Sequence, residues 1–216
     1  MTSAPRTSRP LLLAGGAVLL LALVLIALTL ARPSTSAPAA SAAASAPAES
    51  SADVGFARDM AVHHQQAVEM SFIVRDRTSD EAVRRLAFDI INTQANQRGM
   101  LLGWLEMWGR AKSSPGAPMA WMGHTFTPGG DGALMPGMAT DAQLDALRKA
   151  EGRKAEVLFL RLMTAHHKAG ADMAAAAASS AGTEEIRNLA DGMVRGQQSE
   201  IALMADMLKE RGASAS

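Results

Sequence analysis

The chain of 216 residues contains no cysteine and no tyrosine, and only 4% of its residues are aromatic. The absence of cysteine excludes disulfides, zinc–thiolate sites, a thiol nucleophile and a lipid-modified cysteine near the N-terminus. Lysine and arginine together number 21, as do aspartate and glutamate, so the formal net charge is zero. A zero net charge gives no reason to expect nucleic acid or another polyanion as a partner.

Methionine, by contrast, is abundant, with 14 residues, whereas ordinary protein cores use it sparingly. Histidine is scarce, but four of the five histidines form two adjacent pairs. Each pair lies in the pattern Phe-x3-Met-x2-His-His-x5-Met, which runs from Phe56 to Met70 and again from Phe159 to Met173. Paired histidines beside methionine, repeated in one chain, indicate a metal site.

The repeat extends well beyond these two patterns. With the same shift that relates His63 to His166, matches continue without a gap from Asp53 and Glu156 to Gly109 and Gly212. A repeat of this length is larger than a solenoid unit. It predicts two copies of a helical hairpin, and therefore an all-α, pseudo-symmetric bundle.

The N-terminal part predicts a membrane anchor. Residues 1–10 are polar, with arginines as their only charged side chains, and we expect them on the cytoplasmic side. Residues 11–30 form an uncharged, nearly continuous apolar run of the ~20 residues that span a bilayer as a helix. A cleaved signal peptide is the alternative. Residues 31–52 are rich in Ala, Ser and Pro and read as a flexible linker to the globular part, 53–216.

Apolar residues at three- and four-residue steps, together with turn and capping signals, place the helices of the globular part. The predicted helices span residues 53–77, 78–109, 140–151, 153–179 and 184–210. We expect capping boxes at Thr78–Glu81 and Thr140–Gln143. Loop 111–139 is rich in Gly and Pro. It carries Met119, Trp121, Met122, His124, Met135 and Met138. This loop forms either a second soft-metal site or a cover over the bundle end.

The two hairpins place polar residues beside the histidines. In an antiparallel helix pair, His63 lies level with Gln94 and His166 lies level with Gln197. A ligating histidine usually donates its other ring N–H to an oxygen. The candidate acceptors are Gln94, Gln97, Gln197 and Glu200.

Thioether and imidazole without thiolate suit copper, above all Cu(I), and by the same softness Ag(I). Met60 and His63 are one helical turn apart and can reach one ion. Met70 lies ~10 Å further along the helix axis, so it belongs to another ion or to the core. Methionines at helical spacing are also typical of a core, so the packing alternative stays open for each of them.

These patterns, with the Met135–Thr140 segment Met-Pro-Gly-Met-x-Thr between them, resemble domain-of-unknown-function family 305. Its best-described members are CopM-like copper-binding proteins of the bacterial periplasm. The resemblance implies a ferritin-like four-helix bundle, export from the cytoplasm, and a link to copper or silver tolerance. The ligands it implies are Met60, His63, His64, Met70, Met163, His166, His167 and Met173. The first half has Gln97–Arg98 where the second has Glu200–Ile201, so the two halves are expected to differ in affinity.

The leading hypothesis is a membrane-anchored, extracytoplasmic protein that binds copper or silver, is not an enzyme, and sequesters the metal or passes it to a partner protein. One alternative is a helical interaction module with structural histidines. A di-iron enzyme is another, but that chemistry requires Glu-x-x-His motifs, which the chain lacks. A haem-binding bundle is the third, although it does not require two adjacent histidines on each helix.

Overall fold

The structure is a computed structural model that describes residues 45–114, 116–123 and 126–214. Over these ranges the chain is helical and has no strand, as predicted. The elements are α2 (Ala52–Arg75), α3 (Glu81–Met107), the 3₁₀ helix η1 (Ala120–Met122), α4 (Asp141–Lys149), α5 (Gly152–Ser180) and α6 (Glu184–Glu210). The order and type of the helices therefore agree with the sequence prediction, and loop 111–139 contains one short 3₁₀ turn.

The predicted membrane anchor, residues 11–30, lies outside the described residues, as do residues 1–10 and 31–44. In the part of the chain that is described, no helix has the length and apolar character needed to cross a bilayer. The end of the predicted linker is not a free tether. The Pro47 carbonyl accepts a hydrogen bond from Arg110, and Glu49 forms an ion pair with Arg58 at 2.5 Å. These contacts fasten the chain to the bundle just before α2 begins.

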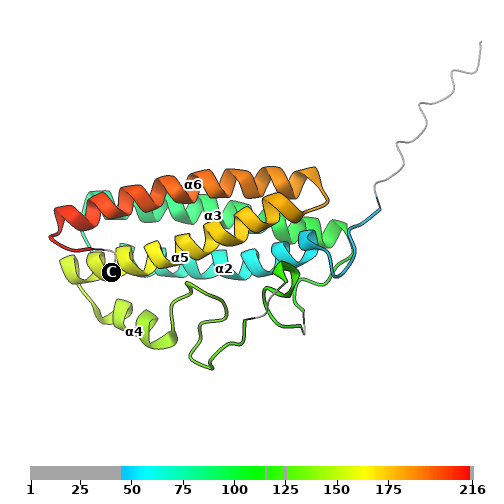
Figure 1. The fold of residues 1–216 in the computed structure, drawn as a ribbon. Helices are drawn as coiled ribbons and strands as arrows, with labels where there is room; N and C mark the ends of the chain where they lie inside the picture. Colours follow the sequence, from blue (N-terminus) through cyan, green and yellow to red (C-terminus); the bar gives the residue numbers. More distant parts are fainter. Residues whose placement is uncertain (1–44, 115, 124–125, 215–216) are drawn as a thin grey trace, which may run out of the picture. The chain divides into compact units, whose positions relative to one another are not determined.

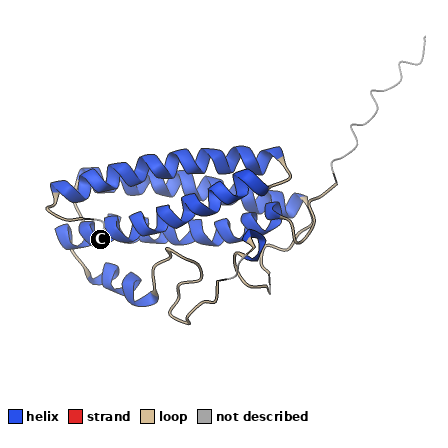
Figure 2. Cartoon of the chain, in the orientation of Figure 1, coloured by secondary structure: helices blue, strands red, loops and turns tan. Residues whose placement is uncertain are grey.

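The four long helices lie side by side, and each half of the sequence repeat forms one hairpin (Figure 1). Helix α2 packs against α3, helix α5 packs against α6, and the two hairpins meet where α2 contacts α5. The short helix α4 contacts α2 and α5, and η1 contacts α2. Figure 2 shows the long, irregular connection between α3 and α4 beside the bundle. The loop is thus an addition to one side of a duplicated scaffold.

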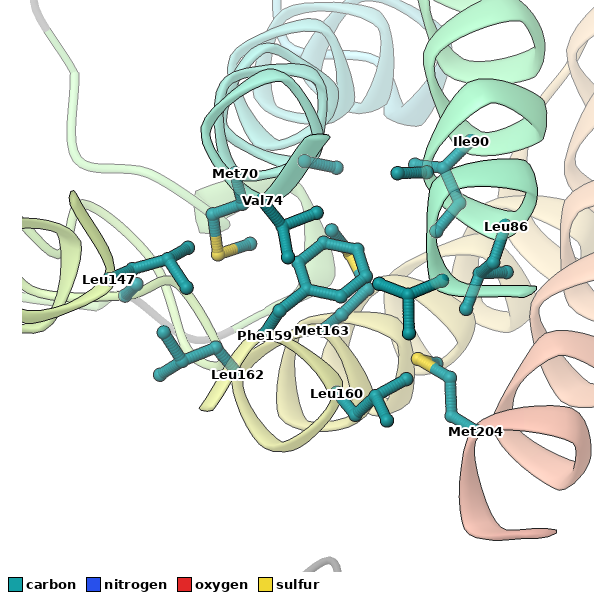
Figure 3. Close-up of a cluster of buried hydrophobic side chains, with 14 of the residues drawn as sticks. Met70, Val74, Leu86, Ile90, Leu147, Phe159, Leu160, Leu162, Met163 and Met204 are labelled. Atoms are coloured by element: carbon teal, nitrogen blue, oxygen red, sulfur yellow. The ribbon is translucent and has the colours of Figure 1, made fainter. Parts of the chain in front are cut away.

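Two apolar clusters form the core, one toward each end of the bundle. The second half of α2 and the first half of α5 share a cluster with Met70, Phe159 and Met163 (Figure 3). The first half of α2 and the second half of α5 share the other, with Met60 and Met173. Helices α2 and α5 are therefore antiparallel, and their histidine pairs lie between the two clusters.

A pair of carboxylates related by the repeat ties each hairpin to the turn of the other. Asp53 at the start of α2 accepts hydrogen bonds from Gly182 N (2.9 Å) and from Thr183 N (2.8 Å) and Oγ1 (2.6 Å). Its counterpart Glu156 accepts from the Thr78 hydroxyl (2.6 Å) and binds Arg211 (2.7 Å). These contacts explain why acidic residues occur at matching positions of the two halves.

Replacing Asp53 by alanine is expected to lower the free energy of unfolding by ~3 kcal/mol, because three donors of the α5–α6 turn lose a buried, charged acceptor. Urea denaturation measures the change. Asp172→Ala, at an exposed position of α5, is the matched control and should change stability by less than ~0.5 kcal/mol. Equal stability of the two variants would show that the turn does not depend on Asp53.

The helix ends confirm one predicted capping box and correct the other. Thr140 and Gln143 form the reciprocal bonds of a capping box at α4. The box predicted at Thr78 is wrong, because α3 begins at Glu81 and Asp80 is its N-cap, accepting from Val83 N at 2.9 Å. The physical reason is local: the Asp80 carboxylate caps α3, while the Thr78 oxygen accepts from Asp80 N at 3.0 Å and the Thr78 hydroxyl donates to Glu156 of α5.

Candidate metal centre

The central histidines of the two repeats meet where α2 crosses α5. The ring centroids of His63 and His166 are 3.7 Å apart with an interplanar angle of 32°, and each residue is 1% exposed. His166 Nε2 lies 3.0 Å from the backbone carbonyl oxygen of His63. Since a carbonyl only accepts, the His166 proton lies on Nε2 and its Nδ1 carries a free lone pair.

The outer histidines are held by the following helix of their own hairpin. His64 Nε2 lies 2.9 Å from Gln97 Oε1, and His167 Nε2 lies 2.6 Å from Glu200 Oε2. These contacts confirm the prediction that Gln97 and Glu200 support the histidines. Both outer rings are fully buried. Bonding at Nε2 again leaves Nδ1 as the nitrogen with a free lone pair.

The centre contains a concentration of buried polar atoms without hydrogen-bond partners among the described residues. They are both ring nitrogens of His63, the Nδ1 atoms of His64, His166 and His167, and the Oε1 atoms of Gln94 and Gln197. Isolated buried polar atoms of this kind are rare and each costs ~1–3 kcal/mol. A set of seven between two apolar clusters therefore indicates a binding centre rather than an ordinary core.

Glycine at position 170 makes room at this centre. A Cβ atom there would lie 2.5 Å from Gln197 Oε1 and 3.1 Å from His63 Cε1. Gln197 and His63, which belong to different repeats, thus approach the same point of α5. Alanine occupies the matching position 67 of the first repeat, so the two sides of the centre are not equivalent.

Burial keeps three of the four histidines, His63, His64 and His166, neutral. Desolvation, reinforced by the neighbouring imidazoles, holds the pKa of His63 and of His166 well below the ordinary value. Burial likewise lowers the pKa of His64 to about 3, although its bond to Gln97 opposes the shift. A metal ion binds the neutral imidazole, so these rings need not lose a proton to act as ligands at neutral pH.

The four predicted methionine ligands are buried on both sides of the histidines. Met60 and Met173 lie in one apolar cluster, and Met70 and Met163 lie in the other. Met60 and Met163 are one helical turn from the central histidines, whereas Met70 and Met173 are ~10 Å from them along the axis. Figure 3 shows Met70 among Val74 and other apolar side chains. The fold thus separates the outer pair of methionines from the inner pair.

The donors do not form a finished cage. Within the described ranges, no three or more His, Asp or Glu side chains are arranged to hold a metal ion. The two central rings lie against each other, and an ion between them would require them to separate. The lone pairs, the neutral state and the soft sulfur neighbours nonetheless form a donor set that suits copper or silver.

The sequence pattern did not reveal the residues that fasten loop 111–139 to α2. Asp59 Oδ2 accepts hydrogen bonds from Met119 N and from Trp121 Nε1, each at 2.8 Å. Gln66 bonds to both backbone groups of Ala139. Asp59 and Gln66 are not repeated in the second half, which has Leu162 and Ala169 at the matching positions. A search for mismatches within the duplication could have found them.

Of the loop methionines, Met119 and Met135 are buried in the same apolar cluster as Met60, and Met122 and Met138 pack against it. This arrangement agrees with the alternative that the loop covers the bundle. Met119 adopts a left-handed backbone conformation with φ of 65°, which is uncommon for a residue other than glycine. His124 lies outside the described residues.

The fold and the centre define a class of protein: an internally duplicated helical bundle with four buried histidines between its hairpins. The chain belongs to the family described as domain of unknown function (DUF305), whose model matches residues 53–208. The predicted family resemblance is therefore confirmed. No curated protein matches the sequence.

Solved structures of the family share the fold. A DUF305 protein from Streptomyces coelicolor is 56% identical, with a TM-score of 0.72 over 77% of this chain and 98% of that chain. A DUF305 fragment from Deinococcus radiodurans is 28% identical, with a TM-score of 0.61 over 74% of this chain and 96% of that chain.

CopM in its Cu(II)-bound form is also similar, with 26% identity and a TM-score of 0.58 over 73% of this chain and 96% of that chain. CopM has further been solved in Cu(I)-bound and silver-bound forms, which match at 21–23% identity. At that distance the likeness shows the fold alone.

Proposed function

We propose that this protein binds copper, with Cu(I) favoured, and also Ag(I), through the histidines between its hairpins. The observation that carries the proposal is the set of five imidazole nitrogens, from four fully buried and neighbouring histidines, that lack partners among the described residues. The similarity to CopM, a protein solved with copper and with silver, supports the choice of metal.

In this proposal, some residues orient the histidine rings and others ligate the metal ion. Gln97 and Glu200 hold the outer rings so that Nδ1 of each is free to ligate. Met60 and Met163, one turn from the central rings, supply soft thioether sulfur from either side. Met70 and Met173 are the least favoured of the predicted ligands because they lie ~10 Å from the central histidines along the helix axis.

The proposed role is binding rather than catalysis, on the extracytoplasmic side of the membrane. Residues 11–30 would anchor the chain, or would direct its export if cleaved. Sequestration and hand-over to a partner protein are both consistent with thioether ligands, which bind soft ions and leave no thiolate to oxidise. The partner would accept Cu(I).

A Cu(I) competition titration against a chromogenic chelator of known affinity tests the proposal on residues 46–216, which form one compact unit. We expect the protein to withdraw Cu(I) from the chelator and Ag(I) to compete for the same centre. Failure to take up either ion from a moderately strong chelator would leave the histidines with a structural role only.

The asymmetry between Gln97 and Glu200 gives a graded prediction. A carboxylate accepting from the ring N–H makes an imidazole a better ligand than an amide does. Glu200→Gln is therefore expected to weaken Cu(I) binding roughly tenfold, and Gln97→Glu to strengthen it. The same titration measures both variants, and opposite signs are required. A loss of affinity in both would mean that the side-chain fit, not the charge, controls the outer rings.

A further inference from the structure

A second candidate site lies on the outer side of the first hairpin, where loop 111–139 covers α2 and α3. A cavity of about 430 Å³ opens there. Its walls include the apolar side chains of Ala61, Val62, Leu102, Leu134, Met138 and Leu144. None of the described histidines lines it, and a cavity of this size holds a small organic molecule.

Two arginines line this cavity with donors that are not used. Arg58 is 6% exposed, and its guanidinium is held by the Ala111 carbonyl (2.7 Å) and by Glu49. Its third nitrogen, Nη2, is buried and has no partner in the described part of the chain. Arg98 makes no hydrogen bond or ion pair with any described residue, and its Nε is also buried. A guanidinium stays charged, so both arginines require an acceptor.

The carboxylates nearby do not meet this requirement. Glu69 also lines the cavity, but it is engaged by Arg148. Asp141, another lining residue, is exposed at the start of α4. Lys112, the third cation of the lining, already has Glu106 as its partner at 2.9 Å. Unused cationic donors therefore remain beside an apolar wall.

We propose that this cavity binds a small organic carboxylate with an apolar body. The carboxylate accepts from the Arg98 and Arg58 guanidinium groups, whose planar donors match its two oxygens. The apolar part rests against Val62, Leu102 and Leu134. The site is separate from the proposed copper centre and goes beyond the proposed function.

The sequence repeat supports a specific role for Arg98. The second half has Ile201 at the matching position, and α6 carries it without a comparable loop over the hairpin. Arginine thus occupies the position beside this cavity, whereas the matching position of the other half is aliphatic. The bundle itself accepts isoleucine at this register, so Arg98→Ile removes the charge with little risk to the fold.

Hexanoate is the probe, titrated into residues 46–216 while the arginine Nε–H resonances are followed by NMR. We expect saturable binding that shifts the Arg98 signal, and an at least tenfold weaker affinity in Arg98→Ile. Arg195→Ile is the matched control, because Arg195 is exposed on α6 and lines no part of the cavity; it should bind like the parent. The Cu(I) affinity of the parent should be the same with and without saturating hexanoate, which separates this proposal from the copper centre.

Hexylammonium and inorganic phosphate complete the experiment. Absence of hexylammonium binding supports an anion site, whereas equal binding of hexanoate and hexylammonium would reduce the cavity to an unspecific apolar groove. Phosphate binding in place of hexanoate would overturn the carboxylate assignment. Unchanged hexanoate affinity in Arg98→Ile would overturn the proposal altogether.

Discussion

Replacing His63, His64, His166 and His167 together by alanine is expected to weaken Cu(I) binding by at least a hundredfold. The physical reason is that the four rings supply all the imidazole nitrogens of the centre, while the buried methionines offer only weaker thioether donors. Competition titration of parent and variant, with circular dichroism to confirm that both are folded, measures the effect.

Two further variants make the experiment decisive. Replacing the same four residues by leucine keeps side-chain volume and removes the unpartnered nitrogens, so a folded and more stable variant is expected to bind no copper at this centre. His124→Ala removes the fifth histidine of the chain and should leave the affinity unchanged. Full copper binding by the leucine variant would show that copper binds at the methionine-rich loop 111–139 and not at the histidines.

Acidification is expected to destabilise the metal-free protein between pH 7.5 and 5.5. The unfolded chain protonates its histidines near pH 6.5. The folded chain does not, because burial lowers the pKa of His63, His64 and His166. Stability is therefore fully present above pH 6.5 and is lost as the pH falls below it. Each of the three histidines contributes ~1.4 kcal/mol over this range, which sums to roughly 4 kcal/mol.

Urea denaturation at pH 7.5, 6.5 and 5.5 measures this loss. The window lies above the ordinary pKa of carboxyl groups, so acidic residues contribute little to the slope. The variant with four leucines is the control, and its free energy of unfolding should be nearly constant across the window. A parent as flat as this control would show that the buried rings are protonated in the folded state.

The local features of the fold could be predicted because they depend on residues close together in the chain. Apolar spacing located the four long helices, and the capping box at Thr140 was correct. Gly109 and Gly212 end matching helices with the same φ of 64°. The box at Thr78 failed because two potential caps lie two residues apart, and the Asp80 carboxylate is the one that caps α3. The sequence pattern did not show which of the two would form.

The candidate centre was predictable to the same extent. The duplicated pattern identified the four histidines, and two of the four candidate acceptors, Gln97 and Glu200, contact them. Counting residues along each hairpin placed Gln94 and Gln197 level with the central histidines, but their Oε1 atoms have no hydrogen-bond partner among the described residues. The sequence pattern could not show that the rings of His63 and His166 lie against each other, because that contact joins the two hairpins and depends on how α2 crosses α5.

The sequence by itself determined the helical class, the duplication, the histidine pairs and the absence of thiol chemistry. Each follows from composition or from a period along the chain. Only the tertiary structure decided that Met70 and Met173 pack among apolar side chains, that Asp59 and Gln66 hold the loop, and that the Arg98 Nε is buried without a partner among the described residues. The reason is that partners and burial depend on helices far apart in the chain, whose packing no local period records.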